Sequence, residues 1–443
     1  MSWFKKLKEI IPAGSMVLAV TTLTSYGVGL LRDRTFAHIF GASRLLDAYN
    51  AAFLLPDLLF NILVASGIAA ACVPLFTELL HGDRERVREY ANGLIAAACG
   101  VMVCVALVLC LFAGPISGLV APGFSFQDQI IVARILRVLA LSPLFFGVSN
   151  VLGAFLVAKK RFLYYGLSPV LYNAGIIGGA LLLAPRWGIT GVAVGTVIGA
   201  FLHFTTRWYD SYKSGFRFST HIRFSSPEFK KTIELMIPKM FGHPVELATF
   251  WGFTAIASTL ATGSVAVLNF ARNFQSVPVS IIGITIATTT FPLLTQASAD
   301  RSFLHFRALL ARSFLLIVAL SGAAAAAMYA VREPLIRILL GGGAFTAGDI
   351  KRTALTLGVF MLAVPTESLV QLFARGFYAT KNTVTPVLLS VMSLIVAVVS
   401  ARMLAPRFDI AALPLAFFIA TGAEAVMLAL LLMVRLRVLE RGV

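Results

Sequence analysis

The sequence has few charged residues for its length. Asp, Glu, Lys and Arg make up only 13% of the 443 residues, whereas ordinary soluble domains carry about 25%. Hydrophobic residues account for 58% of the chain, and its mean hydropathy is +0.88. Apolar runs close to the ~20 residues that cross a bilayer recur along the chain. These values exclude an ordinary soluble protein and predict an all-α polytopic membrane protein.

Cysteine and histidine are also scarce. The four cysteines, Cys72, Cys99, Cys104 and Cys110, lie in apolar stretches without metal-binding spacing, so we expect them to pack rather than to form disulfides. The six histidines are scattered. The sequence contains no phosphate-binding glycine loop, nucleophile elbow or paired catalytic carboxylates on a soluble segment. We therefore expect a protein that is not an enzyme and uses no cofactor or metal, with energy from a coupling ion or the membrane potential.

Positive charge is in excess, with a formal net charge of +17. Because the basic residues form short clusters between apolar blocks, they are typical of membrane topology signals and not of a nucleic-acid surface. Most clusters fall on one side, which predicts a bacterial cytoplasmic (inner) membrane protein with both termini in the cytoplasm. These clusters lie at residues 5–8, 84–88, 159–161, 217–231, 301–307, 375–381 and 435–441.

The apolar blocks between breakers predict about 12 transmembrane helices. Residues 1–213 form the predicted N-terminal six-helix lobe, 214–228 a basic cytoplasmic linker, and 229–443 the C-terminal six-helix lobe. The expected spans are 14–37, 47–80, 91–120, 130–158, 163–183, 188–207, 229–262, 265–298, 303–332, 351–378, 384–403 and 410–436.

Prolines recur at matching positions in the two halves. Such an ordered series favours a six-plus-six duplication, with two lobes related by a pseudo-two-fold axis along the membrane normal. Proline kinks that serve packing alone remain the alternative. The matched pairs are Pro56 and Pro278, Pro74 and Pro292, Pro143 and Pro365, and Pro169 and Pro386.

Three ionisable residues lie in or beside the first two apolar blocks. Arg32, Asp33 and Asp47 are expensive at membrane depth, so they are expected to line a polar cavity or a substrate path. The alternative is that Arg32 and Asp33 reach the interface and extend to water.

The first part of the chain resembles the N-terminal signature of the MurJ/MviN lipid II flippases, a family of the multidrug/oligosaccharidyl-lipid/polysaccharide exporter superfamily. The resemblance runs from about residue 14 to the end of the sequence. The segments that carry it are residues 29–33, 39–42, 46–49, 56–59, 73–77, 121–124, 263–265, 291–294, 376–378, 381–383 and 385–387.

The resemblance implies a two-lobed helical transporter that works by alternating access. Such a protein would flip an undecaprenyl-pyrophosphate-linked peptidoglycan precursor, serving cell wall biogenesis and cell shape. In the family, Ser25, Arg32 and Asp47 fall on positions associated with function, and Arg32 would lie near the anionic headgroup. The expected partners are this lipid-linked anionic substrate and membrane lipids, and we expect a monomer.

The sequence departs from the family pattern at several positions. Tyr26, Phe60 and Asn273 stand where family members carry cavity arginines suited to a diphosphate. Ala65 and Ser276 replace expected acidic residues, and twelve spans are found where the family usually has fourteen. These differences leave three alternatives open: a flippase of another lipid-linked oligosaccharide, a multidrug-type exporter of amphipathic cations, and a non-transporting membrane scaffold.

Polar residues in the second half complete the predicted site. Lys239, His243 and Glu246 are spaced to share one helix face if Pro244 does not disrupt it, and Lys239 could partly replace the missing arginines. A structural ion pair is the alternative. Arg272, next to Asn273, is a second candidate. The predicted substrate-binding residues are Arg32, Ser25, Asp47, Lys239, Arg272, Asn273 and Tyr26, and the predicted gating or coupling residues are Asp33, His243 and Glu246.

Overall fold

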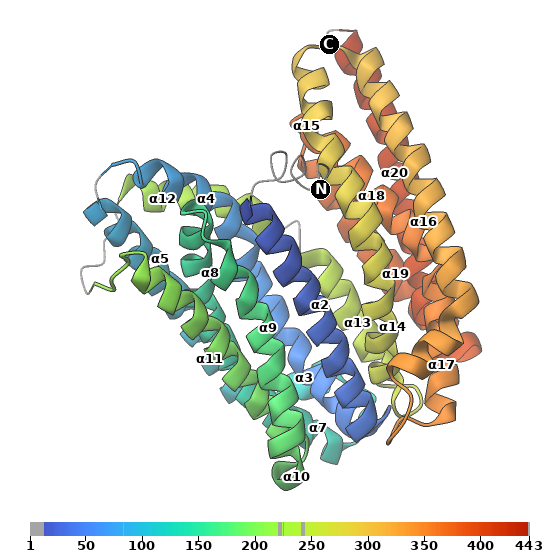
Figure 1. The fold of residues 1–443 in the computed structure, drawn as a ribbon. Helices are drawn as coiled ribbons and strands as arrows, with labels where there is room; N and C mark the ends of the chain where they lie inside the picture. Colours follow the sequence, from blue (N-terminus) through green and yellow to red (C-terminus); the bar gives the residue numbers. More distant parts are fainter. Residues whose placement is uncertain (1–12, 83, 220–223, 225, 241–243, 442–443) are drawn as a thin grey trace, which may run out of the picture. The chain divides into compact units, whose positions relative to one another are not determined.

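The computed structural model describes residues 13–441, except 83, 220–223, 225 and 241–243. The described residues form helices joined by short turns, and they contain no strand beyond an isolated bridge between Gly342 and Phe345. The predicted all-α class is confirmed. Figure 1 shows the helices and their order.

The chain divides into two compact units. The first unit contains Met1–Phe40 and Arg44–Pro244, and the second contains Gly41–Ser43 and Val245–Val443. The helices of the first unit are α2 (Ala13–Phe40), α3 (Arg44–Phe60), η1 (Asn61–Ala65), α4 (Ser66–Leu79), α5 (Arg84–Leu111), α6 (Ala113–Val120), α7 (Phe126–Leu139), α8 (Ser142–Ala158), α9 (Phe162–Gly178), η2 (Gly179–Leu183), α10 (Ala184–Trp187), α11 (Ile189–Lys213) and α12 (Pro227–Met240). Those of the second unit are α13 (Pro244–Ala257), α14 (Ser264–Pro278), η3 (Val279–Ile284), α15 (Thr285–Ala299), α16 (Phe303–Leu339), α17 (Ala347–Phe360), α18 (Ala363–Ala379), α19 (Val384–Phe408), η4 (Asp409–Ala411) and α20 (Ala412–Glu440).

Among the described residues, eight helical stretches are long and apolar enough to cross a membrane. A ninth is counted if α17 and α18, which meet at a bend of 42°, form one span. The stretch Val384–Glu440 holds two helices, α19 and α20, that pack side by side. A multi-pass membrane protein is therefore confirmed, whereas the count of twelve spans and the layout of two six-helix lobes stay predictions.

Helix α12 packs within the first unit. It lies against α4 and α5, and the hydroxyls of Tyr90 on α5 and Thr232 on α12 are 2.6 Å apart. The compact first unit thus extends beyond residue 213 to Pro244. The predicted domain limits, drawn from composition, stay a prediction.

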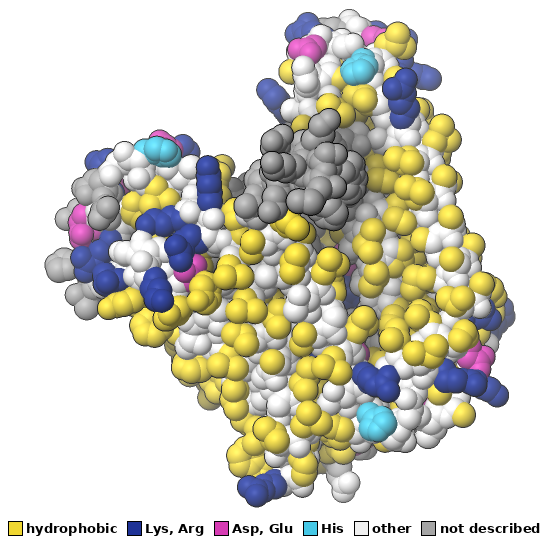
Figure 2. Space-filling view, in the orientation of Figure 1, with side chains coloured by type: hydrophobic (Ala, Val, Ile, Leu, Met, Phe, Trp, Pro, Cys, Tyr) yellow, Lys and Arg dark blue, Asp and Glu magenta, His cyan; other side chains and the backbone are white. Residues whose placement is uncertain are grey.

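The flanks of the helices carry large apolar side chains that no other part of the described chain covers. Leu111 and Leu182 are each 75% exposed, and Leu304 is 80% exposed. Figure 2 shows hydrophobic side chains along the helices of each unit, with Lys and Arg gathered toward the helix ends. Apolar flanks between charged ends are the surface that a lipid bilayer covers.

Local backbone geometry repeats at a fixed distance along the chain. Ser125 and Thr346 each cap a helix by accepting a hydrogen bond from the backbone of an aspartate three residues later. Lys160 and Lys381 both have positive φ, 58° and 59°, just before a helix. Members of each pair are 221 residues apart (346 − 125 and 381 − 160). A positive φ is uncommon for lysine, so its recurrence supports an internal duplication.

The first matched proline pair marks a change of helix type in both units. Pro56 lies in α3 five residues before the π-helical turn η1, and Pro278 is the last residue of α14, directly before the π-helical turn η3. Proline lacks a backbone N–H and clashes with the preceding turn, so it interrupts the helical ladder. π-Helical turns are frequent at functional sites.

Helices α9 and α11 cross at unusually short range through glycines. A Cβ atom on Gly175 of α9 would lie 2.4 Å from the Cα of Gly199 on α11. One on Gly195 of α11 would lie 2.4 Å from the Cα of Gly179, the first residue of η2, which continues α9. Small residues four apart let helix backbones approach closely in a membrane. This crossing fixes α9, which carries part of the candidate site.

Candidate functional site

Arg32 forms the centre of a polar cluster in the first unit. Its Nη2 and Nε donate to Asp33 Oδ1 over 2.8 and 3.1 Å, and its Nη1 donates to Asn173 Oδ1 over 3.0 Å. Asp33 is only 4% exposed, whereas the Arg32 side chain keeps 26% exposure. The arginine is therefore anchored on one side and accessible on the other.

The packing of α2 on α9 brings these residues together. Gly166 on α9 faces Thr21 on α2 so closely that a Cβ atom would overlap the Thr21 hydroxyl. Asn173 is held in place because its Nδ2 donates to the carbonyl of Pro169 over 3.0 Å. Its Oδ1 is thus turned toward Arg32.

The cluster can bind an anion. A guanidinium has five N–H donors, and the hydrogen bonds of Arg32 to Asp33 and Asn173 use three of them. The remaining donors and the accessible edge suit an oxyanion such as a phosphate, which arginine binds in a planar, bidentate geometry. The adjacent Asp33 neutralises the charge, so binding would depend on geometry more than on net positive charge.

A buried hydroxyl pair supports the same region. Tyr49 Oη on α3 lies 2.8 Å from Thr196 Oγ1 on α11, and the Tyr49 ring meets Phe36 of α2 edge to face at 5.4 Å. Tyr49 is 4% exposed. These contacts connect α2, α3 and α11 around the cluster.

Asp47 belongs to a different group of charges. It is 1% exposed, lies in the first turn of α3, and is 3.9 Å from Arg44. Arg44 also lies 3.8 Å from Asp128 and covers the Phe124 ring at 4.6 Å. The ion pairs thus join Asp47 to Arg44 and not to Arg32, and they suit a carboxylate that stabilises a helix N-terminus. A substrate-binding role for Asp47 stays a prediction.

Ser25 and Tyr26 lie on α2 nearer its N-terminus. Ser25 is partly exposed and stands seven residues, about two turns, before Arg32 on the same helix face. Tyr26 is 56% exposed. Both are accessible from outside the first unit, and their predicted roles are untested.

In the second unit, Arg272 and Glu246 form an ion pair. Arg272 Nη2 lies 2.8 Å from Glu246 Oε1, and the guanidinium covers the Phe250 ring at 3.4 Å. Glu246 is in the first turn of α13, where a helix N-terminus favours a carboxylate. Asn273 follows Arg272 on α14 and is partly exposed. The structure thus joins two predicted site residues, Arg272 and Glu246.

Two carboxylates of the second unit, the partly buried Glu367 and the buried Glu424, were not included in the predicted site. Glu367 on α18 accepts a hydrogen bond of 2.6 Å from Gln275 on α14, and Glu424 on α20 accepts one of 2.6 Å from Ser390 on α19. Each bond joins residues far apart in sequence, so local spacing did not connect them. Glu367 adds a polar group that contacts α14, the helix that carries Arg272.

Lys239 and His243 are only partly covered by the structure. Helix α12, which carries Lys239, ends at Met240, and α13 begins at Pro244. His243 lies outside the described residues, and the side chain of Lys239 is not described. The predicted shared face of Lys239, His243 and Glu246 therefore stays a prediction.

Arg207 is a further buried arginine that the sequence did not identify. It is 6% exposed, donates to Ser168 Oγ over 2.8 Å and to the Ser149 carbonyl over 3.1 Å, and covers the Tyr165 ring at 4.5 Å. It lies at the last residue of the predicted span 188–207, and its partners are far from it in sequence, so local spacing did not identify it.

The turn between α8 and α9 carries another arginine, Arg161. Arg161 donates to Asp210 through Nε over 3.0 Å, and this hydrogen bond raises the pKa of Arg161. The pair connects the α8–α9 turn to α11. Across the described residues, no group of three or more His, Cys, Asp or Glu side chains could hold a metal ion.

Comparison with known families gives a match over most of the chain. The family model described as "Lipid II flippase MurJ" matches residues 36–442. The lipid II flippase MurJ of Burkholderia cenocepacia is 27% identical, with 95% of this chain and 82% of that protein covered. The probable lipid II flippase MurJ of Haemophilus influenzae is 26% identical, with 84% of this chain and 77% of that protein covered.

Solved structures show the same fold. A lipid II flippase MurJ in an inward closed conformation superposes with a TM-score of 0.77 and 22% identity, over 93% of this chain and 86% of that one. An inward-facing multidrug resistance MATE family transporter of the MOP superfamily superposes with a TM-score of 0.77 and 13% identity, over 97% of this chain and 99% of that one. At these identities the likeness describes the helical architecture alone.

Proposed function

Because the chain belongs to the lipid II flippase MurJ family, we propose that it moves lipid II, the undecaprenyl-pyrophosphate-linked peptidoglycan precursor, across the cytoplasmic membrane. The match over residues 36–442 and the 27% identity to a lipid II flippase over 95% of the chain support this proposal. The protein would act as a transporter in peptidoglycan biosynthesis and not as an enzyme.

The observation that carries the proposal is the Arg32 cluster. Arg32 lies in α2, keeps 26% of its side chain exposed, and uses three N–H groups on Asp33 and Asn173. Arginine binds phosphate oxygens bidentately, so we propose that its remaining donors contact the diphosphate of the substrate. Arg272, whose charge is shared with Glu246, is the corresponding candidate in the second unit.

Transport would proceed by alternating access, with both termini in the cytoplasm and the chain acting as a monomer without a cofactor. An inside-negative potential favours outward movement of an anionic headgroup by about 2.3 kcal/mol per charge per 100 mV. A coupling ion is the alternative energy source. Lipids and the lipid-linked substrate are the proposed partners, and we propose no nucleic-acid partner.

Complementation tests the proposal. A bacterium depleted of its own lipid II flippase would receive this chain, its Arg32→Ala variant, or Arg186→Ala, with membrane levels of each measured by immunoblot. Arg186 provides the matched control because it is an exposed arginine of the short helix α10. We expect growth with the wild-type chain and Arg186→Ala, and lysis with Arg32→Ala.

The other outcomes separate the alternatives. Expression at normal levels without growth rescue would contradict lipid II as the substrate. Rescue that Arg32→Ala leaves intact would contradict the role of Arg32 and direct attention to the other polar groups at membrane depth.

A further inference from the structure

Arg375 on α18 of the second unit is anchored by neutral groups. Its Nη1 donates to the backbone carbonyl and to the side-chain Oε1 of Gln371, each over 3.0 Å, and its Nη2 donates to Thr288 Oγ1 over 3.0 Å. Arg375 stays partly exposed. The guanidinium is therefore held in place and still accessible.

The charge of Arg375 is not balanced by a carboxylate. Within the described part of the chain, Arg375 forms no ion pair, whereas Arg32 pairs with Asp33 and Arg272 pairs with Glu246, both at 2.8 Å. A charge that is partly removed from water is costly unless an opposite charge or hydrogen bonds compensate it. Arg375 therefore favours an anionic ligand more strongly than the two paired arginines do.

Unused hydrogen-bond donors lie at this guanidinium. The hydrogen bonds of Arg375 use three of its five N–H groups, and its Nε has no partner among the described residues. The exposed Thr288 accepts from Arg375, but its own hydroxyl hydrogen has no acceptor in the described ranges. Its neighbour Thr289, in contrast, donates to the Thr285 carbonyl over 3.0 Å. The Thr288 hydroxyl can therefore donate to a ligand.

Tyr378 adds a third donor on the same face of α18. It follows Arg375 by three residues, so the two side chains are neighbours on the helix surface. Tyr378 is 39% exposed, and its hydroxyl has no hydrogen-bond partner among the residues that the structure describes. A guanidinium and two hydroxyls thus offer donors to one ligand.

Close packing of α18 against η3 and α15 positions these groups. A Cβ atom on Gly283 of η3 would lie 2.5 Å from Ser368 Oγ on α18, so only glycine permits this approach. Ser368 lies seven residues, about two turns, before Arg375, and Gly283 lies five residues before Thr288. The glycine contact therefore holds the two helices together where Arg375 meets Thr288.

The helix that carries Arg375 has a polar face. Glu367, Gln371 and Arg375 follow one another at intervals of four residues, so they lie along one side of α18. Helices α17 and α18 together are long and apolar enough to form one bent span. Charged side chains in such spans face protein or water and not lipid tails. We therefore expect the exposed part of Arg375 to meet water, from which an anion can reach it.

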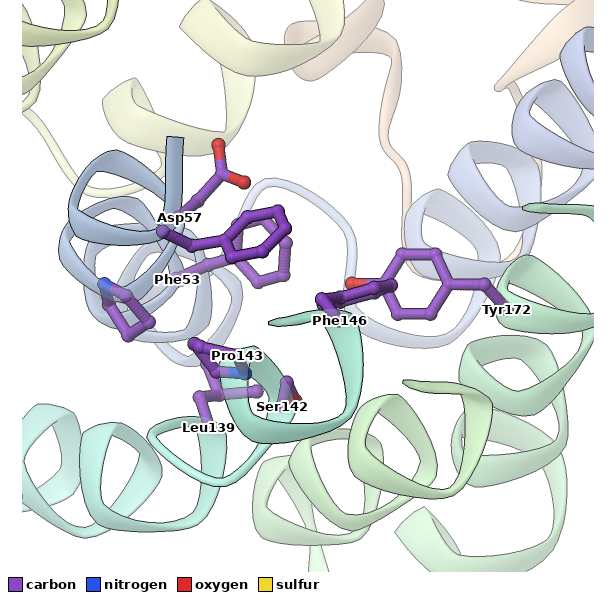
Figure 3. Close-up of a pocket in the computed structure, with 9 residues that line it drawn as sticks. Phe53, Asp57, Leu139, Ser142, Pro143, Phe146 and Tyr172 are labelled. Carbon is purple, nitrogen blue, oxygen red and sulfur yellow. The ribbon is translucent and has the colours of Figure 1, made fainter. Parts of the chain in front are cut away.

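An enclosed pocket in the first unit does not offer another anion site. It lies between α3, α7, α8 and α9, has room for about one water molecule, and carries the carboxylate of Asp57 in its wall. Figure 3 shows Phe146 and Tyr172 beside each other there, and their ring centres are 5.0 Å apart. A phosphate group does not fit into this pocket, and Asp57 would repel it.

We propose that Arg375, Thr288 and Tyr378 form a binding site for a diphosphate group carried by a lipid. Arg375 binds phosphate oxygens through its remaining N–H groups, and the Thr288 and Tyr378 hydroxyls donate one hydrogen bond each. The site rests on the proposed function and deepens it, because it names a further place where the chain contacts the substrate diphosphate. Arg375 supplies the positive charge that the paired Arg32 and Arg272 have already shared with carboxylates.

Titration of the purified full chain with farnesyl diphosphate tests the site. This probe joins a diphosphate to a short prenyl chain, and its binding is measured by calorimetry at one fixed detergent concentration. Arg375→Gln should weaken binding about 10-fold, and Thr288→Val and Tyr378→Phe about 3-fold each, since each variant removes donors. Arg375→Lys keeps the charge but loses the planar fork, so its affinity should lie between those of the wild type and Arg375→Gln.

Arg402→Gln provides the matched control. It removes an exposed arginine from α19 of the same unit and should bind farnesyl diphosphate as the wild type does. The helical content and elution volume of each variant are measured first. Thr288→Val and Tyr378→Phe, which change exposed side chains, keep the test decisive if Arg375→Gln does not fold.

Phosphatidylglycerol distinguishes the two sources of a lipid phosphate. If the site recognises a diphosphate, a large excess of phosphatidylglycerol should leave the affinity for farnesyl diphosphate unchanged. Displacement of farnesyl diphosphate by phosphatidylglycerol would show a phospholipid headgroup site and would overturn the proposal.

Three further results would overturn the site. They are the absence of binding to the wild-type chain, equal binding by the wild type and the folded site variants, and an equal loss of binding in Arg402→Gln and Arg375→Gln. A failure of the proposed function is read separately. A wild-type chain that binds farnesyl diphosphate through Arg375 but does not rescue a flippase-depleted bacterium would contradict lipid II transport and support the site.

Discussion

Arg32 and Asp33 are neighbours in the sequence and form an ion pair of 2.8 Å within one helix, with the carboxylate 4% exposed. Adjacent helix positions do not normally face each other, so the pair depends on the length of the arginine side chain and on its anchor at Asn173. The arginine is therefore compensated in charge yet keeps unused donors. An anion that binds it shares the guanidinium with Asp33.

This pair should be energetically coupled. Arg32→Ala and Asp33→Asn should each lower the free energy of unfolding in detergent, because each breaks this ion pair. The double variant should lose about 1–2 kcal/mol less than the sum of both. Because Arg32 is partly exposed, this coupling energy should be smaller than that of a fully buried ion pair. Denaturant unfolding of the four chains measures the coupling.

The exposed pair of Arg337 and Glu333 provides the control. Its side chains are 66% and 45% exposed, so its coupling should be about 0.3–0.5 kcal/mol, as for other exposed helix pairs. A coupling energy between Arg32 and Asp33 that is no larger would show that their burial does not strengthen the pair.

The hydroxyl pair of Tyr49 and Thr196 should respond unequally to the loss of either partner. In Tyr49→Phe, Thr196 still donates to the Val192 carbonyl at 2.9 Å, so the cost should be about 1 kcal/mol. In Thr196→Val, the buried Tyr49 hydroxyl loses its partner, and the cost should approach about 2–3 kcal/mol. The unfolding midpoints of both variants measure the two losses of stability. A larger loss in Tyr49→Phe than in Thr196→Val would contradict the hydrogen bond between the two hydroxyls.

The glycine crossing of α9 and α11 should not tolerate a single methyl group. A Cβ atom at position 195 meets the Cα of Gly179 at 2.4 Å, and backbone cannot move aside cheaply. Gly195→Ala should therefore destabilise the protein by about 1–3 kcal/mol. Gly178→Ala is the control, since its Cβ atom would have no neighbour within 4 Å. Thermal unfolding in detergent compares them, and equal midpoints would disprove the close approach.

Much of the architecture follows from the sequence, because apolar length and proline position are local properties. The matched prolines at 56 and 278 predicted a repeat, and both occur just before π-helical turns. The interruption of the helical backbone hydrogen bonds was predictable from the prolines. The π-helical form was not, because it depends on how neighbouring helices pack around the break.

The site was predictable only where one residue carries the signal. Arg32 stands out because a charge in an apolar block is costly. Its partner Asn173 is 141 residues away in the sequence, and the packing of α9 on α2 brings the two together. Asp47 has the same sequence signal as Arg32 but pairs with Arg44 near a helix start. Local pattern thus identifies costly groups, and tertiary packing decides what they contact.

The most direct measurement is the appearance of fluorescently labelled lipid II in the outer leaflet of proteoliposomes that contain the purified chain. A membrane-impermeant quencher reports the exposed fraction over time, and Arg32→Ala and Arg186→Ala are compared at equal protein density. The account predicts translocation by the wild-type chain and by Arg186→Ala, and a reduction of at least about 10-fold in Arg32→Ala. Equal translocation by all three chains, or none by the wild type, would contradict it.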